Sequence, residues 1–119
     1  MVIPSFFCYY TSMSHMSKNT LHSGSVRVII FKEKRVWYGA VLEFNIVESG
    51  TDPREIMLSL DEAIRGYVEC ARKARLSPKV LNQKPASEYE KMWKKLQQGK
   101  PIPSPIQVYS FGEQKLTFV

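Results

Sequence analysis

The side chains that could do chemistry in this chain are few, and their spacing is poor for catalysis. Asp61 and Glu62 are adjacent in a segment with helical periodicity, and two-metal nucleases hold their ions with carboxylates of this kind. Such a site also needs a carboxylate on the first strand, but the first β-rich segment, VRVIIF, contains none. We therefore interpret Asp61 and Glu62 as part of a solvated helix face.

Other catalytic and metal-binding patterns are missing as well. The two histidines, His15 and His22, have no third ligand nearby, so we interpret both as ordinary surface residues and expect no metal. The sequence holds no G-x-S-x-G, P-loop, C-x-x-C or H-E-x-x-H motif. Cys8 and Cys70 are too few for a disulfide framework, and we expect Cys70 to be a small buried residue. The sequence predicts no enzyme and no cofactor.

Charge divides the chain into two unlike halves. The formal net charge is +6, yet residues 25–71 hold eight acidic and six basic side chains. Residues 72–119 hold ten basic and three acidic ones. A mildly acidic half joined to a strongly basic half indicates two different partner surfaces.

The basic half offers one function, binding to the phosphates of a nucleic acid. Its candidate contacts are the basic side chains of residues 72–100. They are Arg72, Lys73, Arg75, Lys79, Lys84, Lys91, Lys94, Lys95 and Lys100. No helix-turn-helix, zinc-finger or RRM signature accompanies them, so nucleic-acid binding is the alternative hypothesis.

The elements that position these side chains begin with β-rich segments. Val26–Phe31 and Val36–Phe44 flank the charged turn Lys32–Arg35, and a four-residue connection favours an antiparallel hairpin. A third short segment, Asn45–Ser49, ends at Gly50. The pattern predicts a three-stranded antiparallel sheet.

A helix follows from about Asp52 to about Arg75. Asp52 is suited to accept from the free backbone donors, Pro53 suits the first helical position, and Glu55 has capping-box spacing. Pro78 cannot continue the helix. The apolar stripe that we expect to face the sheet comprises Ile56, Leu60, Ala63, Ile64, Tyr67, Val68 and Ala71.

The second half adds a short helix and one or two strands. After a loop at residues 77–86, Ser87 is a plausible cap for a helix that runs to about Gln98, and a proline-stiffened arm follows. Ile106–Phe111 and Lys115–Val119 form either a hairpin around Gly112 or one bulged strand. The fold class is therefore α+β.

We divide the chain into a leader of residues 1–24 and a single domain of residues 25–119. The leader is rich in polar residues without periodicity, so we expect it to be flexible and not to reach the core. Met13 and Met16 lie inside it and are alternative translation starts. The leader lacks a positively charged start, and no apolar run suits a membrane, so we expect a cytoplasmic protein.

Three motifs in the domain resemble the HicB antitoxin family. Residues 37–44 read WYGAVLEF, residues 50–52 read GTD, and residues 56–67 read IMLSLDEAIRGY. In that family a Tyr- and Val-rich strand precedes a Gly-Thr turn and a helix with a Glu-Ala pair and a late Tyr. The proline run PIPSP at residues 101–105 is similar to the family's usual ending, so the resemblance covers roughly residues 25–119.

The resemblance implies a degenerate, partial ribonuclease-H-like domain without nuclease activity. HicB proteins often add a C-terminal DNA-binding module, and we expect none here because the matching residues extend to Val119. Such a domain binds a small HicA-like mRNA interferase and blocks its active site. We expect a homo-oligomer that contacts a small basic toxin-like protein through an acidic face. The contacts that we expect are Glu43, Glu48, Asp52 and Glu55. A structural domain without such a partner is the remaining alternative.

Overall fold

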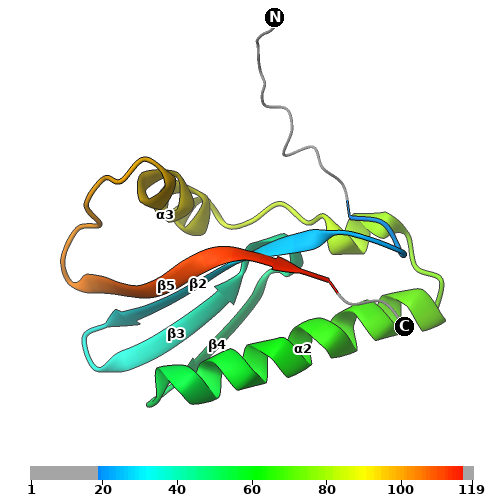
Figure 1. Ribbon diagram of the computed structural model, residues 1–119, viewed down its shortest axis with the longest axis horizontal. Coiled ribbons are helices and arrows are strands. Elements are labelled where there is room, and N and C mark those ends of the chain that lie inside the picture. The colour runs from blue at the N-terminus through cyan, green and yellow to red at the C-terminus, as the bar shows by residue number, and fades with distance from the viewer. Residues whose placement is uncertain (1–18, 117–119) are drawn as a thin grey trace, which may run out of the picture.

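Strand β2 (Ser25–Glu33) organises the sheet, because it pairs with a neighbour on each of its edges. The computed structural model describes residues 19–116. In it, β3 (Val36–Val41) pairs with one edge of β2, and β5 (Ile106–Lys115) pairs with the other edge of β2. Strand β4 (Ile46–Gly50) pairs with the outer edge of β3. The order is β4-β3-β2-β5, and every pair is antiparallel (Figure 1).

The predicted α+β class is confirmed, but the predicted three-stranded sheet is wrong by one strand. The C-terminal segment joins the sheet beside β2 as one bulged strand, and no hairpin forms around Gly112. The register shifts where Ile30 pairs with Ser110 and Phe31 with Val108, which leaves Tyr109 as the extra residue. Sequence patterns do not show which edge of a sheet a distant strand will join.

The first hairpin is tighter than predicted. Glu33 pairs with Val36, so only Lys34 and Arg35 form the turn, and Lys34 takes a left-handed backbone with φ of 62°. The next strand is also shorter, because Leu42–Phe44 form the 3₁₀ turn η2.

Helix α2 (Pro53–Lys73) begins as predicted, with the Asp52 side chain accepting from the backbone N–H of Arg54 at 2.9 Å. Five residues of the expected stripe are buried, namely Ile56, Leu60, Ile64, Val68 and Ala71, whereas Ala63 and Tyr67 are half-buried. The expectation that Cys70 is buried is wrong, because Cys70 is exposed. Successive helical residues are about 100° apart, so Val68 and Ala71 face the sheet while Cys70 does not.

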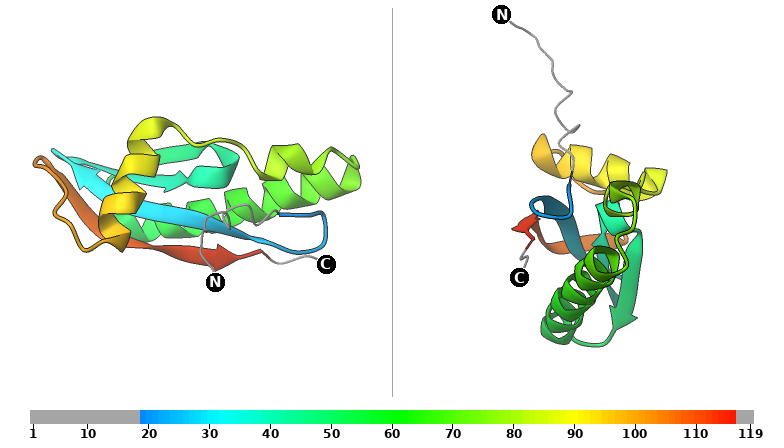
Figure 2. Two further views of the ribbon diagram at one scale, coloured as in Figure 1. Left: turned by 90° about the horizontal axis from the view of Figure 1, so that it is seen from above. Right: turned by 90° about the vertical axis from the view of Figure 1, so that its right-hand side faces the viewer.

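The sheet lies between α2 on one face and α3 (Ser87–Gln97) on the other (Figures 1 and 2). Val26, Ile30 and Val41 pack with α2, and the alternate residues Ile29 and Phe31 pack with Met92 and Trp93 of α3. Both faces of β2 are therefore apolar and covered. A one-turn 3₁₀ segment, η3 (Pro78–Leu81), connects the helices and buries Leu81.

The predicted leader is too long at its C-terminal end. Asn19 is buried, its side-chain amide donates to the Leu81 carbonyl at 2.7 Å, and its Oδ1 accepts from the backbone N–H of Ser25 at 2.8 Å. Leu21 packs against the core as well. Residues 19–24 therefore belong to the packed domain, whereas residues 1–18, with His15, Met13, Met16 and Cys8, lie outside the described residues.

Candidate functional site

Glu43, one of the four predicted acidic contacts, is engaged inside the molecule. It lies in η2, and its two carboxylate oxygens accept from the Arg27 backbone N–H at 2.7 Å and from Arg27 Nε at 2.5 Å. Arg27 also donates to Glu90 of α3 at 2.6 Å, and its side chain is only 17% exposed. Burial opposes its charge, but Glu90 and Glu43 outweigh that effect and raise the pKa of Arg27. Glu43 therefore connects η2, β2 and α3.

The other three predicted acidic residues follow one another from β4 into the start of α2. Glu48 pairs with Gly39, whose missing side chain makes room for Ile56 of α2, so Glu48 is on the α2 side of the edge strand. Asp52 caps the helix, and Glu55 is exposed in its first turn. The structure thus keeps Glu48, Asp52 and Glu55 along one continuous piece of chain and separates Glu43 from them.

An exposed apolar pair, which sequence reasoning missed, lies in the N-terminal half of α2. Leu58 is 71% exposed and Met57 is 45% exposed. Leu58 follows Glu55 by three residues and precedes Glu62 by four. At this spacing both glutamates are neighbours of Leu58 on the helix surface. We call Glu55, Leu58 and Glu62 the outer surface of α2, because Met57 lies about 100° around the helix from Leu58, toward β5. The sequence did contain a sign of this exposure, because Met57 and Leu58 fall outside the apolar stripe that was predicted to face the sheet.

Two ion pairs lie along the rest of α2. Asp61 lies 2.5 Å from Arg65, and it also accepts from the side-chain amide of Gln114 on β5 at 3.0 Å. Glu69 lies 3.0 Å from Lys73, whose hydrogen bond and charge lower the pKa of Glu69. Within residues 19–116, no three His, Cys, Asp or Glu side chains come together in a way that could hold a metal ion.

The predicted nucleic-acid contacts do not form one surface. Arg72, Lys73 and Arg75 lie at the C-terminal end of α2, whereas Lys91, Lys94 and Lys95 lie on α3, across the sheet from α2. Figure 2 shows the two helices on opposite sides of the sheet. The remaining lysines of this set, Lys79, Lys84 and Lys100, are in the segments before and after α3.

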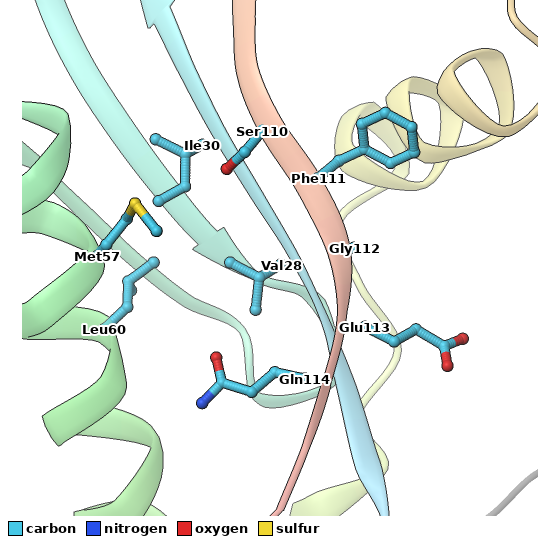
Figure 3. A pocket seen from close by; sticks show the side chains of 9 residues that line it. All are labelled: Val28, Ile30, Met57, Leu60, Ser110, Phe111, Gly112, Glu113 and Gln114. Carbon is cyan, nitrogen blue, oxygen red and sulfur yellow. The ribbon is translucent and has the colours of Figure 1, made fainter.

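A groove of about 240 Å³ runs between α2 and β5 (Figure 3). Val28 and Ile30 of β2 form its floor, and Met57 and Leu60 form its wall on the helix side. Gln114 points into the groove, whereas Phe111 and Glu113 of β5 point away from it. The groove exists because α2 lies mainly over β3 and β4, which leaves this part of the sheet less covered.

In comparisons with known proteins, no family model, no curated protein and no solved structure matches this chain. Neither helix among the described residues is both long and apolar enough to span a membrane. The relation to HicB antitoxins stays a prediction.

Proposed function

We propose that this chain is a non-catalytic protein-binding module of the antitoxin type, which engages a small basic partner through the outer surface of α2. The motifs at residues 37–67 support the HicB-like, partial ribonuclease-H-like assignment on which this proposal draws. The partner class is a small HicA-like mRNA interferase.

The observation that carries the proposal is the exposure of Leu58. A leucine that is 71% exposed on a regular helix contributes nothing to the core of this chain. Of its helix neighbours at three- and four-residue spacing, three are acidic and one is basic, namely Glu55, Asp61, Glu62 and Arg54, so the surroundings of Leu58 carry a net negative charge. Glu48 and Asp52 extend the negative charge toward β4. An apolar centre with a charged rim is the usual arrangement of a protein interface. The rim favours a partner with positive charge.

The nucleic-acid alternative receives less support from the arrangement of the basic residues. A phosphate backbone is tracked by a continuous positive surface, whereas the candidates here are divided between the end of α2 and α3. Lys73 is also paired with Glu69. The alternative still has a clear signature, which is binding that falls steeply as salt rises.

The proposal can be tested by co-expressing the full chain with the protein encoded by the adjacent small reading frame. We expect the two proteins to co-purify and to elute together in size-exclusion chromatography with a defined stoichiometry. A parallel titration of the chain with labelled single-stranded RNA and duplex DNA examines the alternative. Absence of a complex with the small protein contradicts the proposal, and steeply salt-dependent nucleic-acid binding supports the alternative instead.

A further inference from the structure

The β2–β3 hairpin extends past the start of α2, so the cover that α2 gives to the sheet ends before the hairpin turn (Figure 1). Gly50, at the end of β4, pairs with Trp37, and α2 begins shortly after Gly50. Trp37 and Gly39 are two residues apart on β3, so Trp37 shares the face on which Gly39 meets α2. Lys32 pairs with Trp37 and shares this face too. Both residues therefore lie where the cover of α2 ends.

Two aromatic rings and one ammonium group meet on this face. Tyr109 of β5 is 51% exposed, and its ring centroid lies 5.6 Å from that of Trp37 with an interplanar angle of 83°. Lys32 Nζ lies 5.6 Å from the centroid of the Trp37 ring. A β-bulge re-aims the side chain of its extra residue, and here that residue is Tyr109, which reaches Trp37 across β2.

The charge around these rings is positive. The hairpin carries three basic side chains, namely Lys32, Lys34 and Arg35. Glu33 directly follows Lys32 on β2, so its side chain points to the opposite face. Glu48 of β4 shares the face of the rings, but two strands separate it from Tyr109. This surface is therefore opposite in sign to the outer surface of α2, and it suits an anionic ligand better than the small basic partner.

We propose that Tyr109 and Trp37 form a stacking platform for a single-stranded nucleic acid, whose phosphates contact Lys32, Lys34 and Arg35. Exposed aromatic rings beside cationic side chains are a common way to bind unpaired bases without sequence preference. A simple polyanion would not use the rings, and an apolar protein partner would not use the three cations. The platform is independent of the proposed function and of the basic side chains at residues 72–100.

The test is fluorescence anisotropy of a labelled oligouridylate that is titrated with the full chain at several salt concentrations. We expect a plot of log Kobs against log salt to have a slope of roughly −2, because each of three cations contributes about −0.7 with a single strand. A duplex RNA of the same length should bind at least roughly tenfold more weakly, because its bases are already paired and stacked. Binding through the more numerous basic side chains at residues 72–100 would have a steeper slope and would not disfavour the duplex.

Substitutions on the two faces of β5 locate the platform. Tyr109→Ser should weaken oligouridylate binding roughly tenfold because it removes a stacking ring, and Tyr109→Phe should bind like the unmodified chain. Phe111→Ser is the matched control, since Phe111 is 46% exposed on the same strand but packs against Trp93 of α3 on the other face. Circular dichroism confirms that each variant is folded.

Charge reversals compare the two basic surfaces. Lys34→Glu/Arg35→Glu should weaken binding and make the salt slope shallower, whereas Lys91→Glu/Lys94→Glu should do neither. Absence of oligouridylate binding, equal effects of Tyr109→Ser and Phe111→Ser, or loss of binding in the Lys91/Lys94 variant would each overturn the proposal. If Tyr109→Ser weakens only the complex with the small basic partner, the surface is a protein contact and the proposal is wrong.

Discussion

At the residue scale, two glycines show how differently the same residue type can be used. A Cβ atom on Gly39 of β3 would lie 2.5 Å from Leu60 Cδ1 and 2.6 Å from Ile56 Cγ2, whereas a Cβ on Gly66 of α2 would meet nothing within 4 Å. Gly39 therefore allows α2 to approach the sheet closely. Gly66 has no such role and only weakens the helix.

The substitution Gly39→Ala should destabilise the protein by about 1–3 kcal/mol, because the added methyl group overpacks the contact between α2 and β3. Gly66→Ala, the matched control, should stabilise it by about 0.5–1 kcal/mol through helix propensity. Urea unfolding followed by circular dichroism measures both. Equal effects of the two substitutions would show that α2 does not pack against Gly39 as described.

Arg27 is the second residue with a measurable role, because it connects Glu43 and Glu90. Arg27→Met leaves both carboxylates without their partner, and we expect a loss of about 2 kcal/mol, since the group is partly screened by solvent. Arg54→Met is the control, because Arg54 is 83% exposed and its pair with Asp52 is 3.8 Å long. It should change stability by no more than about 0.5 kcal/mol in the same unfolding measurement.

Some of these residue roles could be predicted from the sequence, and others could not. The cap at Asp52 depends on residues next to it in the chain, so local spacing was enough to find it. The ion pairs of Glu43 and Glu90 with Arg27 depend on residues far apart in the chain. Arg27 is 16 residues from Glu43 and 63 residues from Glu90. Contacts between residues so far apart leave no local signal.

At the element scale, the two helices end in the same way with different residues. Both ends place a left-handed residue just after the helix, Arg75 with φ of 51° after α2 and Gly99 with φ of 69° after α3. In each, the next residue returns a backbone hydrogen bond to the last turn, from Leu76 to Ala71 and from Lys100 to Lys95. Glycine accepts this backbone without strain, but arginine does not.

The substitution Arg75→Gly should therefore stabilise the protein by about 1 kcal/mol, because it removes the strain of a left-handed arginine. Gly99→Ala should instead destabilise the protein, by a similar amount, because alanine is strained in a left-handed backbone. Thermal unfolding of both variants at one pH measures the difference. A loss of stability in Arg75→Gly would contradict the geometry described for the end of α2.

The elements themselves were easier to predict than their limits and partners. Periodicity located both helices and the first three strands, because these signals come from neighbouring residues. It did not show the N-cap of α3, which is Ala86 rather than Ser87 and makes no side-chain cap bond. Nor did it show that β5 joins β2 across a bulge, because that depends on tertiary pairing.

At the scale of the whole molecule, the fold presents two surfaces that the core does not explain. One is the outer surface of α2, where Leu58 is exposed near acidic residues, and the other is the outer edge of β5, where Tyr109 and Phe111 are exposed. The sequence indicated an acidic half and a basic half, but it did not show that the basic side chains are divided between two sides of the sheet. Only the three-dimensional arrangement favours protein binding over nucleic-acid binding through residues 72–100, because it shows how the charged side chains are grouped.

The central claim is that the outer surface of α2 binds a small basic protein. Isothermal titration with the protein from the adjacent small reading frame tests it directly, comparing the unmodified chain with Leu58→Asp and with Glu55→Lys/Glu62→Lys. Leu76→Asp, at an exposed leucine beyond the end of α2, is the control.

We expect Leu58→Asp to weaken binding by at least tenfold at every salt concentration, because it removes the apolar centre of the interface. The charge reversal should weaken binding more at low salt than at high salt. Leu76→Asp should bind like the unmodified chain. Equal affinities for Leu58→Asp and Leu76→Asp would contradict the claim.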